Sequence, residues 1–157
     1  MYKNVKQGWY KIQNSSKHLI PGDRFMQSFN EATNSVLYKS GLELKAIRYC
    51  DLSPKIKKWS LEPYPIKYRK PTDNRVHRYY VDLYVEYATG ARFLIEIKPS
   101  TQIVPPRMPK KQTRKSLLTF QRAQVTFGIN TAKWDAAAAF AEKFGMTFAF
   151  LTEKELG

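Results

Sequence analysis

Apolar and polar residues alternate along two neighbouring stretches near the middle of the chain, residues 76–87 and 91–98. The apolar positions are Val81, Leu83 and Val85 in the first stretch and Phe93, Ile95 and Ile97 in the second. A period of two is typical of strands with one buried face, and the Gly-containing turn between the stretches predicts a β-hairpin. Glu96 and Lys98 then share one strand face, and pairing brings Asp82 close to Glu96.

Helical spacing of apolar residues predicts a first helix over residues 41–51, with Ile47 and Cys50 on its inward stripe. Ser40 and Glu43 spell a capping box, S-x-x-E, at the start of this helix. Glu43 therefore has two open interpretations, a capping residue or a carboxylate of a functional site. Cys50 is the single cysteine, so it cannot form an internal disulfide, and it is predicted to be a small core residue.

Further elements are predicted from apolar spacing and from breaker residues. They are strands at residues 56–61, 64–69 and 146–151, a turn at 71–74, a helix over 116–125, a second helix that begins at Asn130 or Thr131 and is stopped by Gly145, and a short tail at 152–156. No internal repeat and no second domain is predicted.

Residues 1–33 are predicted to form a basic N-terminal arm, because breaker residues interrupt them at 14–17 and 21–23. Two interpretations stay open. The segment contacts DNA or docks on a particle, or it is a terminal extension that covers part of the core.

Composition points to a polyanionic partner. The chain has 157 residues, with 27 Lys and Arg against 13 Asp and Glu, a formal net charge of +14. Such an excess favours nucleic acid through phosphate neutralisation. A membrane surface is not expected, because neither a basic amphipathic helix nor a lipid anchor is evident. No membrane-spanning run and no apolar signal region is present, so the expected location is the cytoplasm or a particle assembled there.

The strongest basic segment is residues 99–115, which contain four prolines and no acid. Its cations are Arg107, Lys110, Lys111, Arg114 and Lys115. A basic loop that begins one residue after Lys98 is well placed to hold a DNA backbone, whereas the alternative is a solvated linker. His77 and Arg78 either bind the scissile phosphate or simply begin a surface strand.

Asp82, Glu96 and Lys98 carry the candidate chemistry. A carboxylate supplies the hard oxygen ligands that Mg²⁺ prefers, and a lysine beside it can stabilise phosphate charge or help to deprotonate a water. The alternative is that both acids face water on a half-exposed sheet.

Asp82 followed by Glu96-Ile97-Lys98 matches the PD-(D/E)xK nuclease pattern, and Glu43 fits the extra helical acid of many members. More narrowly, the chain resembles the head-completion nucleases of tailed bacteriophages over residues 34–156. The matching stretches are YKSGLE at 38–43, IKY at 66–68, HRYYVD at 77–82 and NTAKW at 130–134. The later part also resembles the endonuclease subunit of certain cut-and-paste transposases. Val81 stands where the pattern usually has proline, which removes no chemical group.

The resemblance implies an α/β fold with a central mixed β-sheet flanked by helices, the restriction-endonuclease-like core, in a single domain of residues 34–157. It implies Mg²⁺-dependent hydrolysis of double-stranded DNA, with Mn²⁺ able to substitute. The implied metal ligands are Glu43, Asp82, Glu96 and the backbone carbonyl of Ile97, and Lys98 would face the attacking water or the phosphate.

The family's task is to trim or finish packaged DNA ends before a tail joins the phage head. Phage head, portal or packaging proteins are therefore expected partners, and the expected locations are the host cytoplasm and the virion. Two alternatives stay open. One is a non-catalytic DNA-binding head-assembly protein, and the other is a transposase-type or recombination endonuclease.

Overall fold

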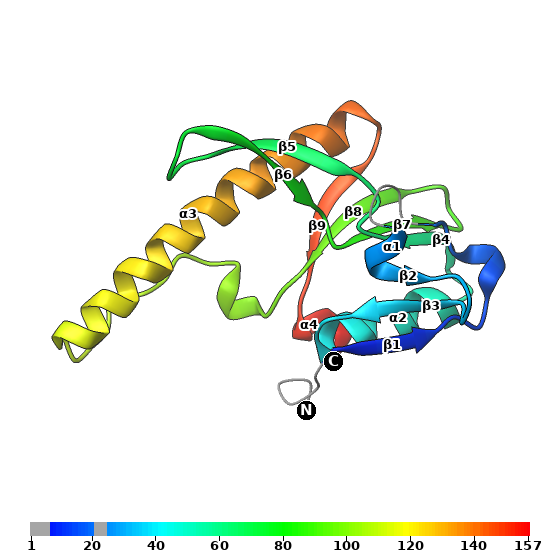
Figure 1. The fold of residues 1–157 in the computed structure, drawn as a ribbon, viewed down its shortest axis with the longest axis horizontal. Helices are drawn as coiled ribbons and strands as arrows, with labels where there is room; N and C mark the ends of the chain where they lie inside the picture. The colour runs from blue at the N-terminus through cyan, green and yellow to red at the C-terminus, as the bar shows by residue number, and fades with distance from the viewer. Residues whose placement is uncertain (1–6, 21–24) are drawn as a thin grey trace.

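The computed structural model describes residues 7–20 and 25–157 (Figure 1). Its centre is a four-stranded β-sheet in the order β4-β7-β8-β9. The strands are β4 Ile56–Leu61, β7 Leu83–Tyr87, β8 Arg92–Ile97 and β9 Thr147–Leu151. β4, β7 and β8 pair antiparallel, whereas β9 pairs parallel to β8, so the sheet is mixed.

Helices cover both faces of this sheet. Helix α2, Gly41–Leu52, packs on one face, where Ile47 joins a core cluster with the fully buried Trp59. Helix α3, Arg114–Lys143, packs on the other face, where Trp134 joins a second cluster with Leu94. The predicted α/β fold with a mixed sheet flanked by helices is therefore confirmed. Successive residues of β8 point to opposite faces of the sheet, so Ile95 joins the first cluster and Leu94 joins the second.

Two smaller sheets and several short helices complete the fold. The elements are a three-stranded sheet of β1 Gly8–Lys11, β3 Ser35–Tyr38 and β2 Phe29–Asn30, a two-stranded sheet of β5 Pro65–Lys70 and β6 Arg75–Tyr80, and the short helices η2 Ser15–Lys17, α1 Phe25–Ser28, η3 Ser100–Gln102 and α4 Glu153–Leu156. No helix in the described ranges is both long and apolar enough to cross a membrane.

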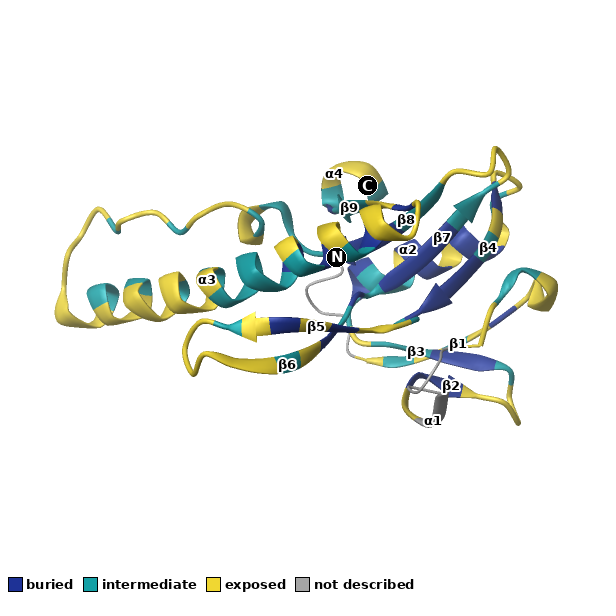
Figure 2. Cartoon of the chain, turned by 90° about the horizontal axis from the view of Figure 1, so that it is seen from above, coloured by how far each residue is buried: buried dark blue, intermediate teal, exposed yellow. Residues whose placement is uncertain are grey.

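Figure 2 shows that the N-terminal half of α3 is largely exposed and projects away from the buried central sheet, alongside the loop of residues 99–113. The β5–β6 hairpin lies against the C-terminal part of the same helix. The molecule therefore has a packed centre and a long basic projection.

Two predicted elements are corrected by the structure. The expected helix start at Asn130 or Thr131 is wrong, because α3 runs unbroken through both residues. Thr131 bonds the carbonyl of Phe127 at 2.8 Å, a bond to residue i−4 that a helix interior accommodates. The real N-cap is Thr113, so Arg114 and Lys115 lie in the first helical turn. The predicted stop is confirmed, because Gly145 has φ +72° just past the helix end.

The single strand predicted over residues 76–87 is also wrong, because it breaks at Val81 and Asp82. β6 pairs with β5, whereas β7 pairs with β4 and β8. At the break the Asp82 carbonyl accepts the Glu62 N–H at 3.0 Å. The chain thus passes from one sheet to another, and Asp82 lies at the passage rather than on a strand face.

The N-terminal segment packs on the core where the structure describes it. Ile12 and Phe29 belong to the cluster beneath α2, and β1 pairs with β3 over four residues. The fully buried carboxylate of Asp51 holds this segment. It accepts the Tyr10 hydroxyl at 2.7 Å and the backbone N–H groups of Gln13 at 2.8 Å and Asn14 at 3.0 Å. This arrangement fits an extension that covers part of the core.

Replacing Asp51 by alanine is expected to lower the free energy of unfolding by roughly 3 kcal/mol, because three donors lose a charged acceptor in a buried place. Urea unfolding followed by circular dichroism measures this change. Asp135→Ala, an exposed aspartate on α3, is the matched control and should change the free energy by less than about 0.5 kcal/mol. Equal effects of the two substitutions would contradict the anchoring role.

Candidate active site

A cavity of about 310 Å³ opens where α2, the β6–β7 passage and β8 meet. It is lined by Lys39, Glu43, Glu62, Arg78, Tyr79, Tyr80, Asp82, Glu96 and Lys133. The three predicted acids, separated by up to 53 positions in sequence, therefore share one pocket. Four carboxylates and three cations line the same space, which is a strongly polar site.

Asp82 is fixed by the end of β8. Its Oδ2 accepts the backbone N–H of Ile97 at 2.8 Å. The pKa of Asp82 is raised well above its ordinary value, first by burial and second by the nearby Glu96 carboxylate, while the Ile97 N–H opposes the rise. The side chain thus carries a charge that its surroundings disfavour in the absence of a cation.

Glu96 is buried, with 5% of its surface exposed, so the interpretation that it faces water on a half-exposed sheet is wrong. Both of its oxygens are engaged. The Tyr79 hydroxyl donates to Oε1, and Lys98 Nζ lies 3.5 Å from Oε2. The backbone N–H of Lys98 bonds the Leu151 carbonyl at 3.1 Å, which continues the pairing with β9 and fixes the start of this side chain.

The structure shows half of the predicted capping box at Glu43 and also places this residue in the cavity lining. Its backbone N–H donates to the Ser40 hydroxyl at 3.1 Å, which is one half of the predicted capping box. Within the described residues its carboxylate makes no return bond to the Ser40 N–H, and it lines the pocket instead. Burial raises its pKa to about 7 against the opposing effects of Lys39, with smaller contributions from Glu62 and Glu96.

These carboxylates fit a divalent cation. In residues 7–20 and 25–157 no three His, Cys, Asp or Glu side chains lie close enough to form a ready-made metal cluster. Mg²⁺, however, commonly takes only one or two protein carboxylates and completes its octahedron with water. Asp82 and Glu96 are such a pair, and burial, with a smaller contribution from the neighbouring carboxylates, raises the pKa of both Asp82 and Glu43, so a cation would favour their charged forms.

Five pocket residues were not assigned from the sequence, namely Lys39, Glu62, Tyr79, Tyr80 and Lys133. Glu62 has φ +46° and lies 3.8 Å from Lys39. The Lys133 ammonium lies 5.6 Å from the centre of the Tyr79 ring. All of them except Glu62 had a signal, because they stand within the stretches that carry the family resemblance.

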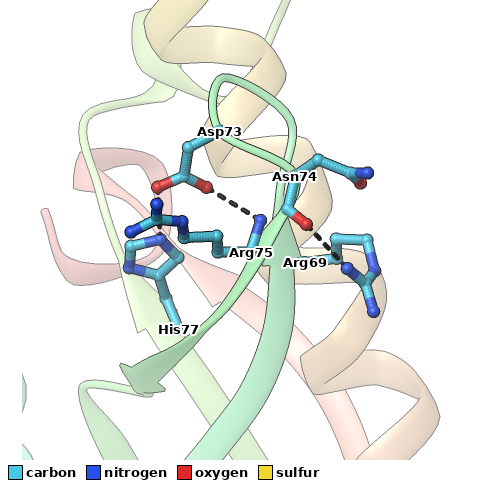
Figure 3. Close-up of polar contacts among 5 residues, drawn as sticks. All are labelled: Arg69, Asp73, Asn74, Arg75 and His77. Atoms are coloured by element: carbon cyan, nitrogen blue, oxygen red, sulfur yellow. Dashed lines mark hydrogen bonds and ion pairs between the residues drawn. The ribbon is translucent and has the colours of Figure 1, made fainter.

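The predicted DNA-binding residues lie in three different places in the structure. Arg78 lines the pocket. His77 does not, because its Nε2 pairs with Asp73 at 2.8 Å at the tip of the β5–β6 hairpin (Figure 3). The five cations Arg107, Lys110, Lys111, Arg114 and Lys115 lie on the loop and the first turn of the projecting α3, outside the pocket lining.

Comparisons with known proteins agree with this geometry. The model of the family described as "TnsA-like endonuclease N terminal" matches residues 53–153, a span that contains Asp82, Glu96 and Lys98. The head completion nuclease of Enterobacteria phage T4 is 34% identical over 121 residues, which cover 77% of this chain and 81% of that protein.

Proposed function

From the premise that this chain belongs to the head completion nuclease family and carries the TnsA-like endonuclease domain, we propose that it is a Mg²⁺-dependent endonuclease of double-stranded DNA. The observation that carries the proposal is the convergence of Glu43, Asp82 and Glu96 in one pocket, with Lys98 beside Glu96. Within this function, the chain would trim or finish packaged DNA ends during head completion.

Asp82 and Glu96, with Glu43 and the backbone carbonyl of Ile97, would hold the metal, and Mn²⁺ would substitute for Mg²⁺. When bound, the ion supplies Lewis acidity at the phosphodiester and lowers the pKa of water. Tyr79 and Lys98 each engage one oxygen of Glu96 and so fix the orientation of this carboxylate. Lys98 would place its ammonium against the phosphate or the attacking water.

The cations outside the pocket would bind the DNA backbone. Arg78 is placed to contact the phosphate next to the reaction, because it lines the pocket that holds the acids. Arg107, Lys110, Lys111, Arg114 and Lys115 form an acid-free basic surface on the projection and would contact phosphates farther away. His77 supports the turn of the β5–β6 hairpin, because its Nε2 pairs with Asp73.

The biological setting rests on the relatives alone. The phage relative favours head completion, with phage head, portal or packaging proteins as partners and with activity in the host cytoplasm or the virion. The family model favours a second candidate, a transposase-type endonuclease of the same chemistry. An adjacent portal or terminase gene supports the first setting, and an adjacent transposase gene supports the second.

Purified protein is expected to cleave plasmid DNA with Mg²⁺ or Mn²⁺ and to lose this activity on chelation. Asp82→Asn, purified in parallel, should lower the cleavage rate by about a hundredfold or more, because it removes a charged ligand from the pocket. Equal cleavage by both proteins would identify a contaminating nuclease. Binding of DNA without cleavage under either metal would support the non-catalytic alternative.

A further inference from the structure

The β5–β6 hairpin has an outer face that the active-site chemistry does not use. In the register of this hairpin Lys67 lies opposite Arg78, and Arg69 lies opposite Val76. The alternate residues Ile66, Tyr68 and Tyr79 point inward and belong to the core cluster against α3. Because successive strand residues point to opposite faces, the exposed Lys67, Arg69 and Arg78 share the outer face.

The outer face carries cations on both strands of the hairpin. Like charges directly opposite across two strands are destabilising, and Lys67 and Arg78 are such a pair. The only acid between residues 63 and 81 is Asp73, at the turn. Figure 3 shows its carboxylate directed to the Arg75 N–H, at 2.9 Å, and to His77, so it serves the turn. The hairpin residues 63–81 therefore supply no carboxylate to the outer face, and its positive charge suits an anionic ligand.

The outer face leads into the active-site cavity. Arg78 is both a member of the face and a residue of the cavity lining, and Tyr80, two positions further along β6, lines the cavity as well. Cations two residues apart on a strand stand roughly 6.6 Å apart, a repeat that suits successive charges along a polymer rather than one isolated ion. The packing of the inner face on α3 fixes the direction of this row.

We propose that the outer face of the β5–β6 hairpin, formed by Lys67, Arg69 and Arg78, is a track for the phosphate backbone that guides double-stranded DNA into the cavity. The inference rests on the proposed nuclease function and adds a binding surface separate from the basic loop. It contacts phosphates and therefore adds affinity without base specificity.

The test measures the affinity for a blunt 30-bp duplex across a series of salt concentrations, in Ca²⁺ so that binding is separated from cleavage. The test plots the logarithm of the association constant against the logarithm of the salt concentration. The double variant Lys67→Gln/Arg69→Gln is expected to make this slope shallower by about two units, because each lost phosphate contact reduces it by about 0.9. Lys67→Gln alone should change it by about one unit. Single-turnover cleavage at saturating protein should stay within about twofold of wild type, since neither residue lines the cavity.

Two controls make the result specific. Arg48→Gln/Lys55→Gln removes the same charge from exposed positions in and just after α2, and it should leave the slope near the wild-type value. Lys67→Arg/Arg69→Lys keeps the charge and should also bind as wild type. The second control matters because Arg69 bonds the Asn74 carbonyl at 2.7 Å and supports the turn (Figure 3).

The outcomes separate the track from the nuclease function. Wild-type cleavage together with an unchanged slope in both hairpin variants would overturn the track, and it would leave an acidic protein partner as the occupant of this face. If the hairpin variants show the shallower slope but the wild-type protein does not cleave DNA, the nuclease function is overturned and the track stays as a DNA-binding surface.

Discussion

Replacing Lys98 by alanine is expected to slow single-turnover cleavage by about a hundredfold or more, while the fold and most of the DNA affinity stay intact. The Lys98 ammonium lies 3.5 Å from Oε2 of the buried Glu96, and in the proposed mechanism it faces the phosphate or the attacking water. A positioned charge that acts only in the transition state contributes on this scale. The cost in stability in metal-free buffer should be up to about 3 kcal/mol, because the loss of the ammonium leaves the buried Glu96 carboxylate with one partner fewer.

Cleavage is measured at saturating Mg²⁺ with excess enzyme, and binding is measured separately in Ca²⁺. Lys55→Ala, at an exposed position before β4, removes the same charge and should cleave at the wild-type rate. Lys98→Arg keeps the charge but replaces a compact ammonium by a planar fork, so a partial loss is expected. An alanine variant as active as wild type would remove Lys98 from the mechanism.

The sequence predicted which acids lie close together better than it predicted their surroundings. Alternation over residues 91–98 correctly placed Glu96 away from Ile95 and Ile97. Alternation describes the two faces of a strand, however, and does not say what covers them. Here α3 and the β5–β6 hairpin cover the second face, so that Glu96 is buried and meets Tyr79. That contact joins two strands of different sheets and has no local signal.

The break at Val81 and Asp82 was missed for a related reason. Both flanking stretches favour strand, and β-propensity continues across them without a proline or glycine. What interrupts the strand is a change of pairing partner, from β5 to β4 and β8, which is a property of the tertiary structure. The same break lets Asp82 bond the Ile97 N–H and face the pocket. The position that departs from the regular pattern is therefore also one of the proposed metal ligands.

Glu43 shows that a local pattern and a site can coincide. The capping box was a sound local prediction, and Ser40 does accept the N–H of residue 43. The bond uses the backbone of Glu43, however, and its carboxylate lines the pocket. A residue can thus satisfy a helix start with its main chain while its side chain serves the site, and sequence spacing cannot separate the two contributions.

Glu43→Gln separates them by experiment. The bond from the residue 43 N–H to Ser40 survives the substitution, so α2 should keep its start. Loss of a charged ligand is expected to slow cleavage by about a hundredfold. The free energy of unfolding, by contrast, should stay the same or rise. The pKa of Glu43 is about 7 in the folded protein, above its ordinary value of 4.5, because burial disfavours the charged form. The charged carboxylate therefore destabilises the metal-free fold above about pH 7, and this penalty fades as the pH falls toward 4.5.

In metal-free buffer at pH 8 the glutamine variant is accordingly expected to match or exceed wild type in the free energy of unfolding, by up to about 3 kcal/mol, and the difference should narrow at pH 4.5. Urea unfolding with a chelator present at the two pH values measures it, and single-turnover cleavage is measured on the same preparations. Glu142→Gln, at an exposed position of α3, is the matched control and should change neither quantity. If Glu43→Gln likewise leaves both cleavage and the pH dependence of stability unchanged, Glu43 acts only at the helix start. A slow variant with wild-type or higher stability at pH 8 places its carboxylate in the reaction, because a capping defect would have lowered both.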